Sequence, residues 1–410
     1  MTEERAPRLH VPEPAIRPGD QPDFSHVRVP RAGEVRRPEP DESPEELRDL
    51  AFTIIRVLNR DGEAVGPWAG SLDDDAIRDG LRHMMMLRAY DARMLKAQRQ
   101  GKSSFYMQHL GEEAISCAFQ KALRPGDMNF PTYRQAGLLI AAGYPLTKMM
   151  CQVYSNDGDP VRGRQLPVFY SSREHGYFSI SGNLATQYVQ AVGWAMANAL
   201  SETGEIAAGW IGDGATASND FHAALLCAST YRPPVILNIV NNQWAISTYT
   251  SVATGGARTY AARARGYGIP ALRVDGNDYL AVAAVSKWAV ARTRAGHGPV
   301  AIEWFTYRVA AHSTSDDPSA YRAKDEAAAW PLGDPVARLK THLIGRGAWS
   351  EERHVQAEAE ILDEVTKVQK EVEAQGTFVN PQPTSPATIF KGVYAEMPAH
   401  LRRQRQEMGY

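Results

Sequence analysis

The sequence predicts an α/β fold in which a largely parallel sheet lies between layers of helices. From about residue 125 to 310, short β-rich runs alternate with longer apolar helical stretches, the pattern of repeated strand–helix–strand units. Runs such as Val235-Ile236-Leu237 lack apolar–polar alternation, as expected of strands that helices cover on both faces. Apolar residues make up 43% of the 410 residues, enough for a large core.

Composition excludes several classes of partner. Lysine plus arginine total 45 and aspartate plus glutamate 47, for a formal charge of −2, so nothing favours nucleic acid or an anionic membrane. No apolar run approaches the ~18 residues of a membrane span. The three cysteines have neither metal-ligand spacing nor a disulfide pattern, and the first residues are acidic and lack an apolar core. We therefore expect an unprocessed, cytoplasmic protein.

Residues 1–45 are predicted to be a separate, extended N-terminal arm. They hold nine of the 26 prolines and one aromatic residue, Phe24, so they cannot build a core of their own. The arm is either disordered or a strap lying on a partner. Scattered apolar residues favour the strap: Leu9, Val11, Phe24, Val27 and Val29.

Two local elements follow the arm. Asp61-Gly62 stands between two apolar stretches, which predicts a β-hairpin over residues 52–68. Ser71 precedes three aspartates, which predicts a capped helix start with favourable acids in the first turn. Apolar residues then continue with roughly helical spacing to Gln100.

The main domain is predicted over residues 46–375, with a proline-broken tail that contacts a partner over 376–410. The candidate strands are Met128–Pro131, Ile206–Ile211, Val235–Val240, Ala271–Val274 and Val300–Thr306. The candidate helices between them include Leu184–Leu200, Asn219–Ser229 and Tyr279–Ala295. A polar, charge-rich helix is expected over 351–375.

Two short polar loops follow neighbouring strands of this sheet. Gly212-Asp213-Gly214-Ala215-Thr216 follows the strand over 206–211, and Asn241-Asn242-Gln243-Trp244 follows the strand over 235–240. Each loop alone is more often an ordinary turn than a site. One strand–helix–strand unit connects them, which places Asp213 and Asn242 side by side at the carboxyl edge of the sheet, where such folds bind ligands.

The chemistry of these loops suits a metal-bound diphosphate. A carboxylate from Asp213, an amide oxygen from Asn242 and the backbone carbonyl of Trp244 form an oxygen-only set of the kind Mg²⁺ prefers. The helix that begins near Ser218 presents free N–H groups to a phosphate. The sequence contains neither Gly-x-x-x-x-Gly-Lys-Ser/Thr nor Gly-x-Gly-x-x-Gly, which argues against a P-loop or a Rossmann dinucleotide site.

These loops resemble the diphosphate motif of thiamine diphosphate enzymes, and the chain is most similar to alpha subunits of branched-chain 2-oxo acid dehydrogenases. The resemblance runs from about Trp68 to the block at 396–403, through several blocks in the same order. They are Ser104-Phe105-Tyr106-Met107-Gln108, Gly111-Glu112-Glu113-Ala114, Phe130-Pro131-Thr132-Tyr133-Arg134, Leu184-Ala185-Thr186-Gln187, Asn241 to Thr248, and His312-Ser313-Thr314-Ser315-Asp316-Asp317. The resemblance implies the thiamine diphosphate-binding fold.

The resemblance also implies which residues hold the cofactor diphosphate. Tyr133 and Arg134 match the family pair that contacts it, and a forked guanidinium suits phosphate oxygens. Gly214 and Ala215 match backbone contacts to the same group. Val240 stands where some relatives have a phosphate-binding arginine, so one charge is missing there or is supplied from elsewhere.

At the other end of the cofactor, Gly182 and Leu184 match positions whose backbone holds the aminopyrimidine ring. Leu184 also matches the residue that wedges the cofactor into its bent shape. The family usually has serine and proline where Gly182 and Asn183 stand, a tolerable change because the contact is made by backbone. A monovalent cation near Ser181, Thr186 and Gln187 is a further suggestion of the same resemblance.

The metal ligands and a catalytic residue follow in the same way. Asp213, Asn242 and the Trp244 carbonyl match the family's metal ligands, and His312 matches an active-site histidine that also contacts the cofactor. A lone histidine is more often structural, but His312 lies in a polar loop after a strand-like run, and an ordinary histidine pKa suits proton transfer. Ala311 replaces a second histidine of some relatives. Ser313 matches a phosphorylated serine of eukaryotic relatives, although nothing in the chain indicates the kinase.

The resemblance implies oxidative decarboxylation of a branched-chain 2-oxo acid, with the cofactor as electron sink and acyl transfer to the lipoyl group of a transacylase. The family glutamate that activates the aminopyrimidine is carried by another domain, and we expect this chain to form only the diphosphate half because its sequence shows no second repeat of the fold. An obligate beta subunit in an α₂β₂ assembly is therefore expected.

Two alternatives remain open. A pyruvate or acetoin dehydrogenase alpha subunit would run the same chemistry on a smaller substrate, and one methylene discriminates only about 10–200-fold. The long N-terminal arm and the block over 312–317 favour the branched-chain interpretation. A non-enzymatic scaffold subunit would be expected to have lost its ligands, yet Arg134, Asp213, Asn242 and His312 are all present.

Overall fold

The computed structural model describes residues 9–12, 17–70, 72–256, 258–382 and 385–410. Its centre is a five-stranded sheet in the order β1-β2-β3-β7-β6, with every neighbouring pair parallel. The strands are β1 (Met128–Phe130), β2 (Ala207–Gly212), β3 (Val235–Asn241), β6 (Ala271–Asp275) and β7 (Val300–Phe305). The mixed α/β fold with a mainly parallel sheet is thus confirmed, and each of these strands lies where the sequence predicted one.

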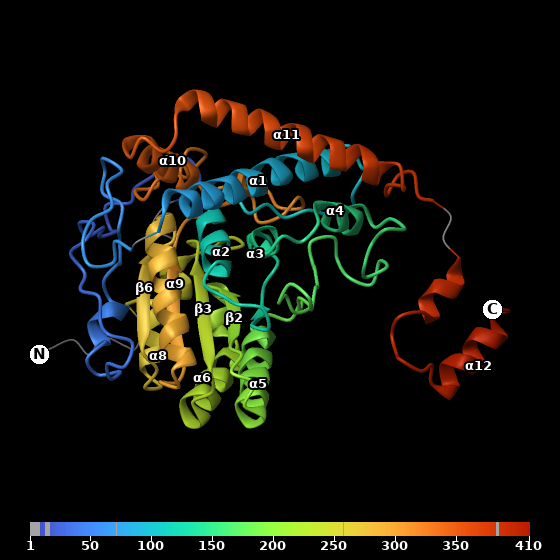
Figure 1. Cartoon of the computed structure of the whole chain (residues 1–410), viewed down its shortest axis with the longest axis horizontal. Coiled ribbons are helices and arrows are strands. Elements are labelled where there is room, and N and C mark those ends of the chain that lie inside the picture. Colours follow the sequence, from blue (N-terminus) through green and yellow to red (C-terminus); the bar gives the residue numbers. More distant parts are fainter. Residues whose placement is uncertain (1–8, 13–16, 71, 257, 383–384) are drawn as a thin grey trace, which may run out of the picture.

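Helices cover both faces of the sheet (Figure 1). The long helices are α1 (Asp74–Arg99), α5 (Thr186–Ser201), α6 (Asn219–Tyr231), α9 (Tyr279–Arg294), α10 (Pro335–Gly345) and α11 (Glu351–Glu373). The shorter ones are α2 (Glu113–Gln120), α3 (Ala136–Ala141), α4 (Leu146–Tyr154), α7 (Thr250–Ala253), α8 (Tyr260–Arg265) and α12 (Ala399–Glu407). The 3₁₀ turns are η1 (Arg48–Ala51), η2 (Gly214–Ala217), η3 (Pro318–Ala320) and η4 (Pro386–Phe390). A two-residue pair, β4 (Trp244–Ala245) and β5 (Thr248–Tyr249), is antiparallel.

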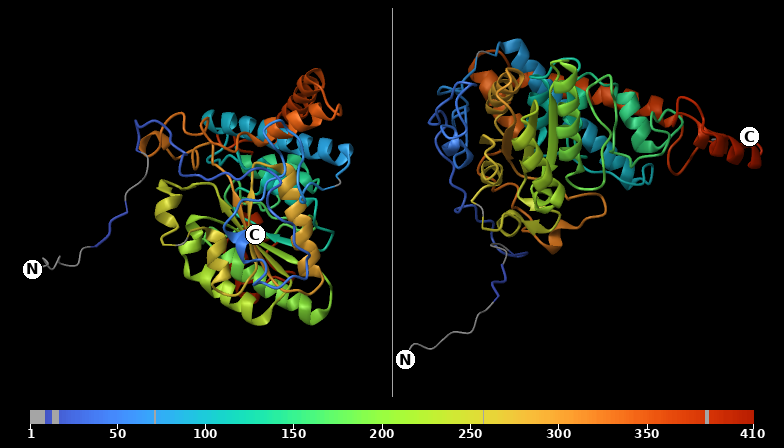
Figure 2. Two further views of the ribbon diagram at one scale, coloured as in Figure 1. Left: turned by 90° about the vertical axis from the view of Figure 1, so that its left-hand side faces the viewer. Right: turned by 90° about the horizontal axis from the view of Figure 1, so that it is seen from below.

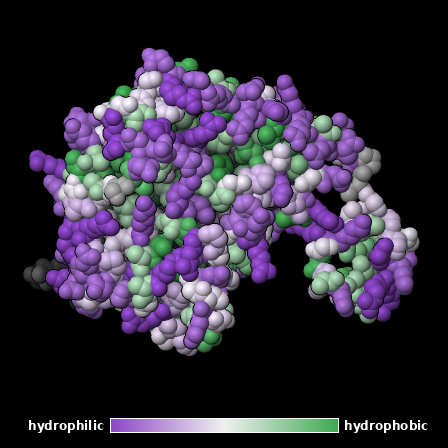
Figure 3. Space-filling view, viewed as in Figure 1, coloured by the Kyte–Doolittle hydropathy of each residue, from purple (hydrophilic) through white to green (hydrophobic). Residues whose placement is uncertain are grey.

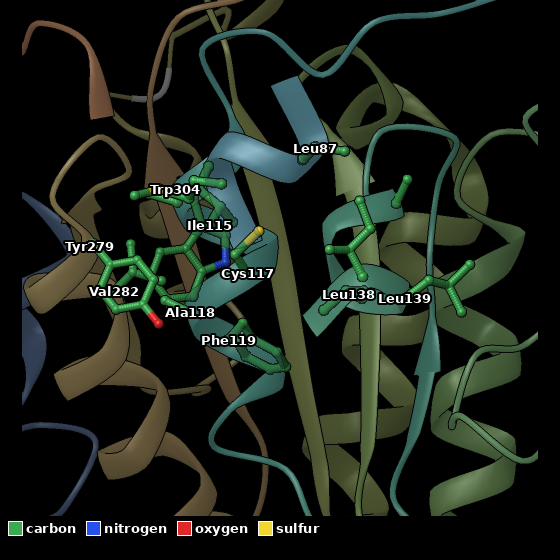
Figure 4. Packing of buried hydrophobic residues seen from close by; sticks show 14 of the residues in the cluster. Leu87, Ile115, Cys117, Ala118, Phe119, Leu138, Leu139, Tyr279, Val282 and Trp304 are labelled. Atoms are coloured by element: carbon green, nitrogen blue, oxygen red, sulfur yellow. The ribbon is translucent and has the colours of Figure 1, made fainter. Parts of the chain in front are cut away.

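The two faces of the sheet pack into two different apolar cores. Along β3, Ile236 and Val240 join the core under α1, α2 and α9, whereas Leu237 and Ile239 join the core under α5, α6 and α8. Both sets are buried, which explains why the strand lacks polar alternation. Figure 4 shows part of the first core, including Phe119 of α2. The ring of Phe119 meets that of Trp210 edge-on, with ring centroids 4.7 Å apart.

The predicted hairpin over 52–68 forms in a short version. The Val65 N–H donates to Val57 O and the Asn59 N–H to Glu63 O, each at 3.0 Å, around an antiparallel bridge between Leu58 and Ala64. Ile55, earlier in the same stretch, forms a parallel bridge to Val274 of the edge strand β6, so this segment also extends the central sheet. The helix after it begins as predicted, but Asp73 caps it by accepting from the Ala76 N–H at 2.7 Å. The predicted cap, Ser71, lies outside the described residues.

The N-terminal arm lies along the chain's own domain from residue 17 onward (Figure 2). The indoles of Trp68 and Trp288 donate to the carbonyls of Arg36 and Pro38, each at 2.9 Å, and Arg292 donates to Pro40 O at 2.6 Å. Of the apolar residues that favoured a strap, Phe24 is buried and Val27 and Val29 pack beside it. The others, Leu9 and Val11, are exposed.

The C-terminal tail projects away from the domain beyond α11 (Figure 1). Arg164 ties it to the body by donating to the carbonyls of Thr388, Ile389 and Lys391. Half or more of Ile389 and Val393 is exposed, and the space-filling view shows apolar surface on this tail (Figure 3). In the described parts of the chain, no helix combines the length and the apolar character that crossing a membrane requires.

Candidate functional site

A cavity of about 460 Å³ lies at the carboxyl edge of the sheet. Its lining comes from the segments that follow β1, β2 and β3, from the turn before α5 and from the loop that follows β7. All of the residues that the resemblance assigns to cofactor binding, metal binding or catalysis lie on this one cavity: Tyr133, Arg134, Gly182, Leu184, Asp213, Gly214, Ala215, Asn242, Trp244 and His312. Their assignment to particular ligand atoms stays a prediction.

Asp213 and Asn242 meet because of strand register. Gly212 at the end of β2 pairs with Val240 of β3, and the Asp213 N–H donates to Val240 O at 3.1 Å. Asp213 Oδ1 accepts from the Gly214 N–H at 2.8 Å, whereas Oδ2 is buried without a hydrogen-bond partner. Burial raises the pKa of this carboxyl to about 7. A buried oxygen without a partner is costly, so the site suits a ligand that neutralises it.

The other two oxygens of the predicted set are held by neighbours. Asn242 Nδ2 donates to Glu112 Oε1 at 2.7 Å, which fixes the amide so that its oxygen faces away from that carboxylate. The Trp244 carbonyl accepts from Arg308 Nη1 at 3.0 Å, which leaves one lone pair for another partner. No cluster of three or more His, Cys, Asp or Glu side chains that could hold a metal occurs among the described residues, so any metal here rests on mixed oxygens.

Arg134 is buried and already tied to two loops. Its Nη1 donates to Gln108 O and its Nη2 to His312 O, each at 2.5 Å, and its Nε lies 3.9 Å from Glu112 Oε1. Burial is the largest influence on Glu112 and raises the pKa of its carboxyl, against the opposing effect of Arg134. The guanidinium therefore has a fixed position before any anion arrives, which reduces the entropy lost on binding.

His312 is set between two cations. Its Nδ1 lies 3.2 Å from Arg134 Nη2, its backbone N–H donates to Asp316 Oδ2 at 2.7 Å, and its ring meets Tyr133 edge-on at 5.8 Å. Burial, then Arg134 and Arg308, lower its pKa to about 3. The ordinary pKa assumed from the sequence is therefore wrong. Because Nδ1 faces a donor, the neutral ring carries its proton on Nε2.

Comparison with known proteins places this architecture in a family. Residues 81–380 match the model of the dehydrogenase E1 component, and residues 5–45 match that of the N-terminal segment of 2-oxoisovalerate dehydrogenase E1 alpha subunits. The chain belongs to the dehydrogenase E1 component family. The resemblance stated from the motifs is thereby confirmed.

This chain has similar relatives over most of its length. It is 58% identical over 402 residues to the 2-oxoisovalerate dehydrogenase subunit alpha of Pseudomonas aeruginosa, covering 98% of both chains. It is 40% identical over 357 residues to the mitochondrial 2-oxoisovalerate dehydrogenase subunit alpha of Mus musculus, covering 87% of this chain and 79% of the relative. It is 38% identical over 321 residues to the pyruvate dehydrogenase E1 component subunit alpha of Acholeplasma laidlawii, covering 78% and 89%.

Hydrogen bonds that the sequence did not predict hold the loop around His312 in place. Arg308 Nη2 donates to the hydroxyl of Tyr321 at 2.6 Å, and that hydroxyl donates to Asp316 Oδ2 at 2.6 Å. Arg322 Nη1 donates to Arg308 O at 2.7 Å. One signal was available: Arg308 comes shortly after β7, which neighbours β3, so it had to lie at the same sheet edge as Asn242.

The segment before α5 forms the open side of the pocket. Leu184 is 54% exposed, and a Cβ added to Gly182 would meet only Phe169, at an ordinary 3.7 Å, so a serine would fit there. Gln187 Nε2 donates to Ser181 O at 3.1 Å, while Gln187 Oε1 is buried without a partner. The monovalent cation suggested near these residues stays a prediction.

One block of the resemblance does not reach the cavity described above: none of Tyr106, Met107 and Gln108 lines it. Tyr106 is fully buried and donates to Asp91 at 2.8 Å. Ser313, the match to a phosphorylated serine, is 9% exposed, and its hydroxyl accepts from the Ser315 N–H at 3.2 Å.

Proposed function

We propose that this chain is the alpha subunit of a branched-chain 2-oxo acid dehydrogenase, the component that decarboxylates the 2-oxo acid and passes the acyl group to the lipoyl group of a transacylase. The observation that carries the proposal is 58% identity to a 2-oxoisovalerate dehydrogenase alpha subunit across 98% of both chains. The cavity supports it, because all of the cofactor, metal and catalytic residues implied by the resemblance line it.

Thiamine diphosphate fits this cavity, with Mg²⁺ at its diphosphate end. Asp213 offers a buried oxygen without a partner, and the Asn242 amide and the Trp244 carbonyl complete a hard oxygen set. A bound cation would offset the desolvation that raises the pKa of Asp213. Arg134 supplies the positive charge beside it.

When bound, the cofactor supplies an electron sink for loss of CO₂ from a 2-oxo acid. The chain's own residues bind, orient and move protons around it. Asp213 and Asn242 would anchor the diphosphate through the metal, and Leu184 would support the bent cofactor. His312, neutral with a proton on Nε2, would donate that hydrogen near the substrate. Its low pKa, about 3, makes it a poor resting acid and favours hydrogen bonding to developing negative charge.

The active site is proposed to be completed by a beta subunit in an α₂β₂ assembly. In the described chain, the acidic side chains on the cavity are Glu112 and Asp213, both engaged at the diphosphate end. The carboxylate that activates the aminopyrimidine would therefore come from the partner. Exposed apolar residues on the outer face of α5, Val189 and Leu200, and on the tail, Val393 and Tyr394, offer surface for that partner.

The decisive experiment is co-expression with the neighbouring beta-subunit candidate, followed by a decarboxylation assay. We expect kcat/KM for 3-methyl-2-oxobutanoate to exceed that for pyruvate, by about 10–200-fold for each discriminating contact. The isolated chain, loaded with cofactor and Mg²⁺, is expected to decarboxylate neither. Robust turnover by the isolated chain would refute the shared active site.

A second candidate is the alpha subunit of a pyruvate dehydrogenase, or of an acetoin dehydrogenase with the same chemistry. The 38% identity to a pyruvate dehydrogenase alpha subunit over 321 residues favours it. The same kcat/KM comparison decides, since a preference for pyruvate would replace the branched-chain proposal. A scaffold subunit without catalysis would show no Mg²⁺-dependent cofactor binding in a titration.

A further inference from the structure

A fully buried pair, Asp91 and His109, lies behind the wall of the pocket. Their side chains are 2% and 0% exposed. Asp91 comes from α1 and His109 from the loop before α2. His109 Nδ1 lies 2.8 Å from Asp91 Oδ1, and His109 Nε2 lies 3.2 Å from the carbonyl oxygen of Tyr133. The ring thus bridges α1 to the segment that follows β1.

The hydrogen-bond partners determine the protons on this ring. Asp91 accepts from the Tyr106 hydroxyl at 2.8 Å and from the His109 backbone N–H at 2.5 Å. These donors favour the ionised carboxylate. His109 Nδ1 faces that carboxylate and Nε2 faces a carbonyl, so both ring nitrogens face acceptors and neither faces a donor. Only the doubly protonated imidazolium satisfies both contacts.

Hydrogen bonds run in both directions between the segment around His109 and the segment that follows β1. His109 donates to the carbonyl of Tyr133, while Arg134 donates to the carbonyl of Gln108 at 2.5 Å. Each segment therefore provides one positively charged side chain that donates a hydrogen bond to a backbone carbonyl of the other segment. Such charge-assisted bonds are roughly twice as strong as neutral ones, and together they hold Tyr133 and Arg134 in place against the cavity.

We propose that His109 is a positioning residue, with a proton on both ring nitrogens, that fixes the Tyr133–Arg134 segment for anion binding. The groups in contact with it agree with a positive ring: Asp91 from α1 accepts from the ring and from the Tyr106 hydroxyl. Asp91 and Glu112 thus offset the charges of His109 and Arg134 in this buried region. The consequence for binding rests on the proposed function of the pocket.

The protonation state is tested by NMR of the full-length chain labelled with ¹⁵N in its histidine rings. His342 provides an internal comparison, because its Nδ1 lies 2.7 Å from Gly62 O while its buried Nε2 has no partner, so one proton is expected there. At neutral pH we expect both ring nitrogens of His109 to carry hydrogen, assigned by loss of the signals in His109→Asn. A singly protonated His109 ring would overturn the proposal.

Two variants separate the two bonds of the ring. In His109→Asn the side-chain amide replaces Nδ1, so the bond to Asp91 can persist while the bond to Tyr133 is lost. In His109→Gln the amide reaches the place of Nε2, so the Tyr133 bond is rescued. With inorganic pyrophosphate and Mg²⁺ as the probe in calorimetry, we expect about 10-fold weaker binding for Asn and near wild-type binding for Gln.

A surface histidine supplies the matched control. His222→Asn changes an exposed ring that contacts Tyr267, with Nδ1 2.9 Å from its hydroxyl, and Phe221, and it should bind pyrophosphate like wild type. Equal affinity of wild type and His109→Asn, or equal losses in the Asn and Gln variants, would overturn positioning through the Tyr133 carbonyl. Failure of the wild-type chain to bind pyrophosphate would instead refute the proposed function. The NMR spectrum of the ring nitrogens would still show whether the His109 ring carries two protons.

Discussion

The two sides of the pocket differ in how firmly the chain holds them. The buried wall, Glu112, Arg134, Asp213 and Asn242, is less than 9% exposed at every residue and is tied to strand ends and to itself. The open wall, Gly182 and Leu184, lies in a turn with Leu184 half exposed. Under the proposed function, the chain itself forms the anion-binding half of the site, and a second subunit would cover the other half.

The largest expected effect comes from removing the carboxylate of the buried wall. Asp213→Ala takes away the one buried oxygen of the set that has no partner, so Mg²⁺-dependent binding of thiamine diphosphate should fall by more than ~100-fold, beyond the usual effect of an outer-shell change. Calorimetric titration with and without Mg²⁺ measures it. Asp363→Ala on the exposed side of α11 is the control, and unchanged affinity in Asp213→Ala would remove the metal assignment.

The next effect separates binding from chemistry at His312. His312→Ala should lower reductive acylation of the lipoyl group by about 10²–10³-fold, the usual range for a lost hydrogen-bond donor to developing negative charge. Cofactor affinity should fall far less, because Asp213, Asn242 and Arg134 remain. Single-turnover acylation and cofactor titration on the same preparation give both numbers. A proportional loss of the two would show that His312 only shapes the pocket.

The buried ionic contacts of the same wall should contribute to the free energy of unfolding. Glu112→Leu leaves the Arg134 charge and the Asn242 amide without their partner, which should lower the free energy of unfolding by about 3 kcal/mol. Glu112→Gln keeps an acceptor for Asn242 and should lose only about 1 kcal/mol. Urea unfolding of both variants checks this, and equal midpoints for Leu and Gln would contradict the ionic role.

Below neutral pH, the free energy of unfolding should depend on the protonation of His312. Its pKa falls from 6.5 to about 3 on folding, so below pH 6.5 the unfolded ring binds a proton that the folded ring does not. This contribution is fully present above pH 6.5 and is lost as the pH falls toward 3. Between about pH 7 and about pH 5, wild type should therefore lose more unfolding free energy than His312→Asn. Parallel losses would contradict the lowered pKa.

The open wall should give the smallest change. Because Leu184 is 54% exposed, Leu184→Ala should alter the free energy of unfolding by no more than about 0.5 kcal/mol. Cofactor affinity should drop by less than about tenfold, since only the support of its bent shape is lost. Leu200→Ala on the helix α5 that follows this turn, 86% exposed, is the matched control. A large loss of stability in Leu184→Ala would show that this wall is structural.

Sequence reasoning located the elements whose signal is local and repeated. The strands of the sheet are continuous apolar runs such as Val235-Ile236-Leu237, and burial on both faces makes that pattern distinctive. The position of Asp213 beside Asn242 followed from the rule that parallel strands end at one edge. The hairpin over 52–68 forms around Leu58 and Ala64, but the bridge from Ile55 to Val274 is a contact that no local pattern encodes.

The supporting residues of the site could not be found in this way. Glu112 was noticed only as part of a motif, and its contact with Asn242 joins residues 130 positions apart. The ordinary pKa assumed for His312 failed because Arg134 and Arg308, far apart in the sequence, converge on it. Burial and convergence of charge depend on the whole fold, so they become visible only with the tertiary structure.

The way the N-terminal arm is fastened has a consequence for how its sequence can vary. Main-chain carbonyl oxygens at residues 36, 38 and 40 accept hydrogen bonds from the side chains of Trp68, Trp288 and Arg292. Every amino acid has such a carbonyl group. Side-chain replacements at those positions therefore leave the fastening intact as long as the backbone path is kept. Mutational tolerance along this stretch should be high, while insertions or deletions that shift its spacing should release it.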